Sequence, residues 1–232
     1  MMVQIGLLFA LMISSADARR MGPDEGTVLN VAPQAEESGL RCNTQKLNNG
    51  VELPEMADLY IRWHPELAWG TPKLVDVLVT ATEELAWQAP HADPVVIGDM
   101  SREGGGPLAG HKSHRGGLDA DVGIFWGNGK QHLQGFNRID PTMIDAQTTW
   151  LFIESMIATG DVERILLDQS LIDVLKHHVI TTGQLTAPEA EKVFPTPNEF
   201  INMWGLQRVV HHLDGHQNHL HIRVYCDSPS DS

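Results

Sequence analysis

Two histidine-rich segments hold the residues of this sequence that could do chemistry. The first, "HKSHRGGLDAD", spans residues 111–121, and the second, "GHQNHLHIRVYC", spans residues 215–226. Neutral imidazoles and ionised carboxylates offer free lone pairs, so both kinds of side chain bind metal ions. The candidates are His111, His114, Asp119, Asp121, His216, His219 and His221. Because the first segment has almost no bulky residue before Leu118, its crowding favours ligation over packing.

The spacing of three candidates fits a catalytic zinc site, which needs three protein ligands and an open position. His114 lies in a glycine-rich loop, Asp121 follows seven residues later in a predicted strand, and His221 lies on the last predicted strand. Side chains at i and i+2 of a strand share a face, so His219 accompanies His221. Glycines 116–117 let the loop fold back toward the strand. The alternative is a surface pair in a turn beside an exposed H-x-H strand.

The elements that must position these side chains follow from hydrophobic spacing. Helices are predicted over 71–89, 148–160 and 170–183. Thr71 can cap the first helix, and Pro72 suits its first turn. One face of this helix carries Leu74, Val75, Leu78, Thr82 and Leu85. Strands are predicted at 94–101, 117–126 and 162–167 and at the C-terminal end. That last strand turns Leu220, Ile222 and Val224 to one face and His219, His221 and Arg223 to the other. This mixture without regular alternation predicts an α+β domain with a small, largely antiparallel sheet flanked by helices and a zinc ion at the sheet.

Composition limits the partners of the chain. An apolar fraction of 42% in 232 residues is enough for one domain with a sizeable core. The formal net charge is −14, and lysine and arginine form no block. Nucleic acid and anionic membrane are therefore excluded as main partners, whereas small molecules, peptides and neutral or mixed-charge polymers remain.

The N-terminus is typical of an exported protein. Residues 5–13 are continuously apolar and precede the A-x-A sequence at 16–18, so residues 1–18 are predicted to be a signal peptide and residues 19–40 a flexible leader. A buried N-terminal helix is the alternative. The chain has two cysteines, Cys42 and Cys226, which an oxidising compartment would permit to pair; two buried thiols are the other possibility.

The combined motifs resemble those of the penicillin-insensitive murein endopeptidases, zinc peptidases related to D-Ala-D-Ala dipeptidases and lysostaphin-type enzymes. That wider group carries H-x6-D followed later by H-x-H, which His114 to Asp121 and His219 to His221 match. His216 matches an extra histidine of the branch. The segments "LNNGVELP", "WGTPKLVDVL" and "GDMSREGGGPLAG" extend the resemblance over roughly residues 40–227, so the expected catalytic domain spans residues 41–228.

The resemblance implies an exported, periplasmic peptidase that hydrolyses the D-alanyl to meso-diaminopimelate cross-links of peptidoglycan without a serine nucleophile. It implies zinc ligands at His114, Asp121 and His221, with His111 as a further metal-binding histidine. His219 would contact the attacking water or the developing oxyanion, and His216 would assist it. A second metal of the branch needs an Asp/His pair; Asp140 and Asp145 are present here without a nearby histidine, so one zinc ion is expected.

The residues themselves leave some roles open. No H-E-x-x-H motif supplies a glutamate base, so His219, His216 or another carboxylate must move the proton. Asp119 could hydrogen-bond a ligating ring or be a solvated turn residue. Arg102 could bind a substrate carboxylate or oxyanion, or pair with Glu103 on the surface.

Two other classes of function compete with the peptidase. One is a zinc-stabilised, non-catalytic domain that binds cell wall or signals. The other is a nucleotide-binding protein, because "GGPLAGHKS" is one residue away from a phosphate loop. A strand rather than a helix is predicted to follow that loop, which argues against nucleotide binding.

Overall fold

The two strands with alternating side chains lie together at the centre of a sheet. The computed structural model describes residues 45–127, 135–194 and 209–226; the predicted signal peptide, the leader and Cys42 lie outside these residues. Strand β5 (Asp119–Gly123) pairs antiparallel with β8 (His219–Val224). The apolar residues of both strands point into the core, as their alternation predicts. Their polar residues consequently share the opposite face.

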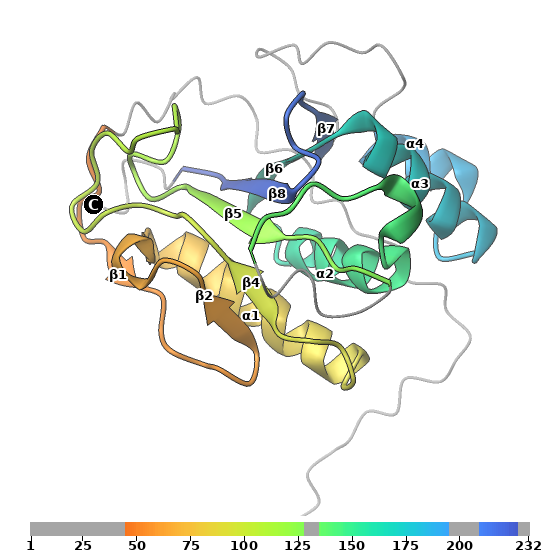
Figure 1. The fold of residues 1–232 in the computed structure, drawn as a ribbon, viewed down its shortest axis with the longest axis horizontal. Coiled ribbons are helices and arrows are strands. Elements are labelled where there is room, and N and C mark those ends of the chain that lie inside the picture. The colour runs from red at the N-terminus through yellow and green to blue at the C-terminus, as the bar shows by residue number, and fades with distance from the viewer. Residues whose placement is uncertain (1–44, 128–134, 195–208, 227–232) are drawn as a thin grey trace, which may run out of the picture.

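Six strands form the larger sheet in the order β2-β4-β5-β8-β6-β7 (Figure 1). The three central pairings are antiparallel, and the two outer pairings, β2 with β4 and β6 with β7, are parallel. The remaining strands are β2 (Tyr60–Arg62), β4 (Val95–Ile97), β6 (Val162–Leu167) and β7 (Val210–His212). A separate antiparallel pair is formed by β1 (Val51–Glu52) and β3 (Trp69–Gly70). The α+β fold with a largely antiparallel sheet is confirmed.

Helix α1 (Pro72–Gln88) begins and ends where the sequence indicates. The hydroxyl of Thr71 accepts a hydrogen bond from the Leu74 amide at 3.2 Å, and Pro72 occupies the first turn. The residues that the helix buries are Leu74, Val77, Leu78, Ala81, Thr82 and Leu85. Val75, which the predicted spacing placed on the buried face, is only half-buried, whereas Val77, which was not assigned to that face, is fully buried.

The described residues contain three further α-helices. Helix α2 (Ala146–Ala158) is capped by Asp145, and α3 (Gln169–Thr181) is capped by Asp168. Helix α4 (Ala187–Val193) was not predicted; a capping box begins it. Single 3-10 turns, η1 (Pro65–Leu67) and η3 (Pro141–Met143), lie in the connections. In Figure 1, α1 and α2 lie side by side behind the sheet, and α3 and α4 lie near β6 and β7.

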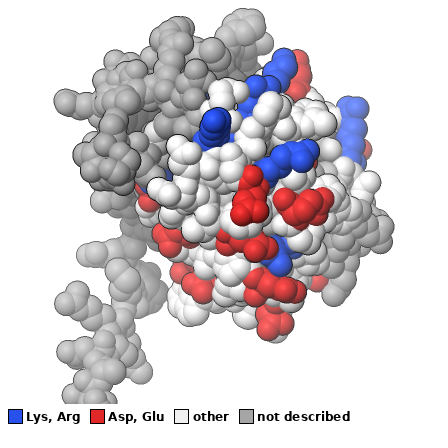
Figure 2. Space-filling view, turned by 90° about the vertical axis from the view of Figure 1, so that its left-hand side faces the viewer, with Lys and Arg blue, Asp and Glu red and all other residues white. Residues whose placement is uncertain are grey.

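The connection from β4 to β5 carries the first histidine-rich segment. Residues 106–118 form a loop without a helix, and a strand follows it. This arrangement contradicts the phosphate-loop interpretation, which requires a helix after the loop. The face of the molecule in Figure 2 shows acidic and basic side chains interspersed among uncharged ones. Within the described residues, no helix combines the length and apolar character that a membrane span requires.

Candidate metal centre

The register of β5 and β8 builds the core of the site. Asp121 lies directly opposite His221, and Asp119 lies opposite Arg223. All four side chains share the face of the sheet away from the core. Asp119 and Asp121 are two residues apart on β5, and His221 and Arg223 are two residues apart on β8. The Oδ1 atom of Asp121 is 2.9 Å from Nδ1 of His221. Two segments about a hundred residues apart thus place two potential ligand atoms side by side.

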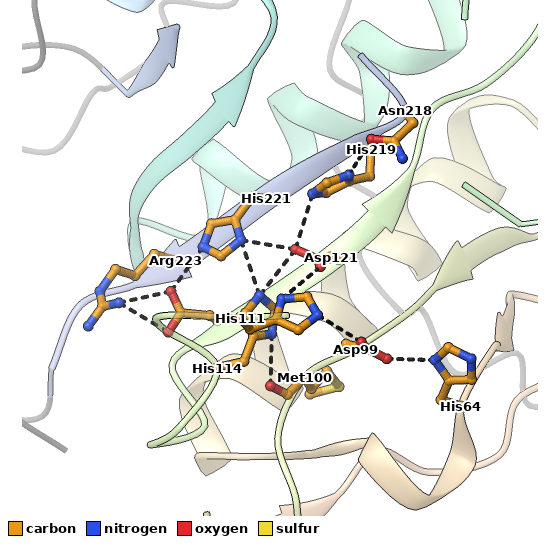
Figure 3. A network of polar contacts seen from close by, with 11 residues as sticks. His64, Asp99, Met100, His111, His114, Asp121, Asn218, His219, His221 and Arg223 are labelled. Carbon is orange, nitrogen blue, oxygen red and sulfur yellow. Dashed lines mark hydrogen bonds and ion pairs between the residues drawn. The ribbon is translucent and has the colours of Figure 1, made fainter. Parts of the chain in front are cut away.

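His114 joins this pair from the glycine-rich loop. Its ring is 1% exposed, and its Nδ1 donates a hydrogen bond to the Met100 carbonyl at 2.9 Å. This bond leaves the lone pair of Nε2 directed at Asp121 and His221. Nε2 is 3.2 Å from Nδ1 of His221 and 3.2 Å from Oδ1 of Asp121. The three atoms form a closed triangle, which Figure 3 shows at the junction of loop and sheet.

This triangle matches the requirements of a zinc ion. Ligand atoms at zinc's usual bond lengths in a tetrahedron are about 3.3 Å apart, and the sides here measure 2.9–3.2 Å. Two imidazole nitrogens and one carboxylate oxygen are a donor set that zinc accepts. The alternative, in which His114 and Asp121 form a surface pair in a turn, is wrong because both side chains are buried. The residues present therefore fit the predicted ion.

His111 lies at the rim of the triangle. Its ring centroid is 4.2 Å from that of His114, and its Nδ1 is 3.6 Å from Oδ2 of Asp121. The ligand atoms of these three residues lie within 4.8 Å of one another, which is close enough to share an ion. The other ring nitrogen, Nε2, is 2.9 Å from Oδ2 of Asp99.

Asp119 holds the outer side of His221. The carboxylate is 1% exposed, which contradicts a solvated turn residue. Its Oδ1 accepts from Nε2 of His221 at 3.1 Å, and both oxygens accept from Nη1 of Arg223 at 2.9 and 3.0 Å. Arg223 in turn contacts Glu163 at 3.3 Å. A hydrogen bond from the far nitrogen of a ligating ring fixes its tautomer and orientation.

His219 and His216 lie on the open side of the triangle. Nδ1 of His219 is 2.7 Å from Oδ1 of Asn218, and its Nε2 is 3.5 Å from Oδ1 of Asp121. The His219 ring stacks on Phe136, with a centroid distance of 5.4 Å. The His216 ring lies 4.8 Å from His219 and 5.9 Å from the His221 ring. Together the three histidines form a second group whose ligand atoms lie within 4.8 Å.

The electrostatics of the site follow from its buried carboxylates. Burial raises the pKa of Asp121, but hydrogen bonds with His114 and His221 outweigh burial and hold that pKa well below its usual range. Burial lowers the pKa of His221, yet its bonds to Asp119 and Asp121 raise the pKa to about 9. Burial lowers the pKa of His219 to about 4, so this ring is neutral at pH 7. A neutral histidine can accept a proton there.

The other predicted residues lie outside this cluster. Arg102 is exposed in the loop after β4, and its substrate role stays a prediction. Asp140 accepts hydrogen bonds from Thr142, and Asp145 accepts them from Thr148, so both carboxylates cap helices. Because Cys42 lies outside the described residues, its pairing with Cys226 also stays a prediction.

Several contacting residues were not singled out from the sequence. They are His64, Asp99, Asn218 and Arg223. The sequence does indicate that Arg223 lies near the site, since it shares the strand face of His219 and His221. The indication for Asp99 is weaker, since it is only a carboxylate directly after a buried strand. His64 precedes a proline in a connecting segment, and nothing in its neighbourhood signals a contact with Asp99.

The chain was compared with protein families and with curated proteins. The family profile described as penicillin-insensitive murein endopeptidase matches residues 42–175, which is more than half of the chain. A search of curated proteins finds no match. The matched region contains His111, His114 and Asp121. His216, His219 and His221 lie beyond it, and the fold brings them to the same place.

Proposed function

Because the chain belongs to the penicillin-insensitive murein endopeptidase family, we propose that it is an exported zinc peptidase that hydrolyses D-alanyl to meso-diaminopimelate cross-links in peptidoglycan. The observation that carries the zinc proposal is the triangle of His114 Nε2, Asp121 Oδ1 and His221 Nδ1, with sides of 2.9–3.2 Å. The predicted signal peptide supports export, and peptidoglycan peptides are the proposed partner. One zinc ion is proposed for each chain.

The chain's own residues would hold the ion in a fixed orientation. His114 is oriented by the Met100 carbonyl, and His221 is oriented by Asp119. A bound zinc ion would polarise the scissile carbonyl and lower the pKa of a water molecule to about 7. Because these ligands come from a loop and two paired strands, they are held before substrate arrives, which lowers the cost of reorganisation.

We assign the proton transfer to His219, with His216 beside it. The Nδ1–H of His219 donates to Asn218, so the lone pair of Nε2 faces Asp121 and the open side of the triangle. During hydrolysis a C–O bond forms and the C–N bond breaks. The proton released by the attacking water passes to Nε2 of His219 and then to the departing amine nitrogen.

The non-catalytic alternative requires that these two histidines take no part. Such a domain would need only the three ligands, and the rings of His219 and His216 could then point anywhere. Both rings lie against the triangle, and Nδ1 of His216 is 3.2 Å from the Leu213 carbonyl, which leaves its Nε2 available. This arrangement favours the peptidase over the non-catalytic domain.

A paired measurement on residues 19–232 tests the proposal. Zinc per chain is counted by mass spectrometry, and purified cross-linked muropeptide dimers are incubated with the protein, with and without a chelator. We expect one zinc and chelator-sensitive conversion of dimers to monomers whose masses identify the cleaved bond. His221→Ala should lose both zinc and turnover. Zinc without turnover would favour the non-catalytic domain, and a chain that binds no zinc would contradict the proposal.

A further inference from the structure

Asp99 lies against the metal-ligating strand although it belongs to the connection after β4. The amide of Gly98 donates to the carbonyl of Asp121 at 2.8 Å, and the amide of Asp121 donates to the carbonyl of Asp99 at 2.9 Å. These two backbone bonds place Asp99 beside Asp121 in the sheet. The backbone of Asp99 is therefore held against the strand that carries a proposed ligand.

The Asp99 carboxylate bridges two histidines. Its Oδ1 is 2.6 Å from Nδ1 of His64, and its Oδ2 is 2.9 Å from Nε2 of His111. The Asp99 side chain is 19% exposed, whereas that of His64 is 44% exposed. The three side chains form a row from the solvent-facing edge to the ligand cluster, and Figure 3 shows this row.

The contact with Asp99 determines which nitrogen of His111 faces the metal centre. An ionised carboxylate only accepts hydrogen bonds, so Nε2 of His111 must carry the proton. In the neutral ring, Nδ1 then keeps its lone pair, and Nδ1 is the nitrogen that lies 3.6 Å from Oδ2 of Asp121. The opposite tautomer would present an N–H to the ion.

We propose that Asp99 is a positioning residue that makes His111 a metal ligand, and that His64 holds the Asp99 carboxylate in place. This inference rests on the proposed metal site but goes beyond it, because it gives the fourth side chain its orientation. An asparagine at position 99 can donate from its amide to Nε2. That donation would move the His111 proton to Nδ1 and remove the lone pair from the metal side.

Cobalt binding to the full mature chain tests the proposal without turnover. Affinity for Co²⁺ is measured by competition with a chromophoric chelator, and visible d–d absorption reports the ligands. We expect Asp99→Asn to weaken binding about 10- to 100-fold and to give the spectrum of His111→Ala. His64→Ala should weaken binding less. Asp173→Asn, which alters an exposed carboxylate on α3, should match the parent.

A double-mutant cycle separates positioning from a general structural effect. If Asp99 acts through His111, Asp99→Asn should cause no further loss of affinity in a His111→Ala background. A further loss there, or parental affinity in the single variant, would overturn the proposal. Should Asp99→Asn fail to fold, parental cobalt affinity and spectrum in both His64→Ala and His111→Ala would overturn it. A parent that binds no divalent metal would instead refute the proposed function.

Discussion

Asp119 and Asp121 lie two residues apart on β5 and share a face, yet their partners differ. Asp121 faces four histidines, whereas the Asp119 carboxylate contacts Arg223 and the outer nitrogen of His221. His221 thus lies between two carboxylates, each of which contacts one of its ring nitrogens. Its ring cannot flip without losing both bonds, which explains how a side chain on an outer strand face is held in one orientation.

His219 offers a test that separates metal binding from proton transfer. In His219→Ala the triangle of His114, Asp121 and His221 is intact, so zinc content should equal that of the parent. Turnover of muropeptide dimers should fall about 10²- to 10⁴-fold, because the group that accepts the proton is lost. Zinc analysis and initial rates on the same preparation measure both quantities.

A matched control uses a remote histidine. His178 lies in the last turn of α3, where its ring contacts Gln147 on the surface. His178→Ala should leave both zinc content and turnover unchanged. Normal turnover in His219→Ala would remove that residue from the mechanism, and loss of zinc would make it a ligand.

Sequence reasoning located the side chains that a strand or a motif brings together. His114, Asp121 and His221 do converge: the pairing of β5 with β8 brings Asp121 to His221, and a hydrogen bond to the Met100 carbonyl holds His114. Asp99 and His64 were not predicted as neighbours, because their contact depends on how a connecting segment crosses the end of β4. Neither belongs to a periodic pattern, and the residues they contact lie 12 and 35 positions away.

The loop between β4 and β5 must follow one path to deliver His111 and His114. Gly105 has φ = +76°, and a Cβ there would lie 2.3 Å from the Arg115 carbonyl oxygen and 2.4 Å from the Leu47 amide nitrogen. Because both contacts are backbone atoms, Gly105→Ala must shift the loop. We expect it to lower the free energy of unfolding and to weaken metal binding, as measured by urea denaturation and cobalt titration.

The neighbouring glycine provides the control. Gly104 has φ = +73°, but a Cβ there would meet no atom within 4 Å. Gly104→Ala should therefore cost only about 1 kcal/mol, from the left-handed backbone. Gly105→Ala should cost about 1–3 kcal/mol more, from the clash. Equal costs for the two variants would show that the close backbone approach does not constrain the loop.

Helix α2 contains a carboxylate whose burial makes stability depend on pH. Burial raises the pKa of Glu154, so the folded chain holds its proton more tightly than the unfolded chain. The Glu154 carboxyl stabilises the folded chain at pH values below its pKa in the unfolded chain. This stabilisation is lost as pH rises through its raised pKa in the folded chain. Glu154→Gln should therefore raise the free energy of unfolding at pH 7, by less than about 1 kcal/mol, and should not raise it near pH 4.

Asp168 should behave with the opposite sign. Burial would raise its pKa, but hydrogen bonds from Ser170 outweigh burial and lower it. Asp168→Ala should cost about 1 kcal/mol at pH 7 through loss of the α3 cap, and the cost should shrink as pH falls through the folded pKa. Urea denaturation at pH 7 and near pH 4 measures Glu154→Gln, and urea denaturation at pH 7 and at pH values below 3.8 measures Asp168→Ala. A pH-independent effect of Glu154→Gln would contradict the role of burial.

Long elements were predictable from the sequence, and apart from β4 the short ones were not. Periodic apolar residues or capping residues predict the elements α1, α2, α3, β5, β6 and β8 from local sequence alone. Strands β1, β3 and β7 contain two or three residues, which is too few for a period, and their existence depends on distant partners. The parallel outer pairings likewise depend on how whole elements cross, so they could not be read from alternation.

At the scale of the molecule, the site depends on the middle of the domain and on its C-terminal end. The family match ends at residue 175, whereas β8 supplies His219 and His221 from beyond it. β8 lies between β5 and β6, so it fills a gap inside the sheet and is no edge strand. β8 therefore contributes both to the sheet and to the candidate metal centre, and its loss would disrupt both.

The predicted disulfide would tie that late strand to the start of the domain. Cys226 follows β8 by two residues and packs against the core, and Cys42 is the first residue of the family match. If the two pair, a cross-link that closes a long loop restricts the unfolded chain, and its removal costs about 2–5 kcal/mol. Cys42→Ser and Cys226→Ser should then each lower the free energy of unfolding by this amount, and the double variant should lose no more. Thiol titration of the unreduced, denatured parent gives the direct readout: no reactive thiol is expected, and two would mean that the ends of the domain are held by packing alone.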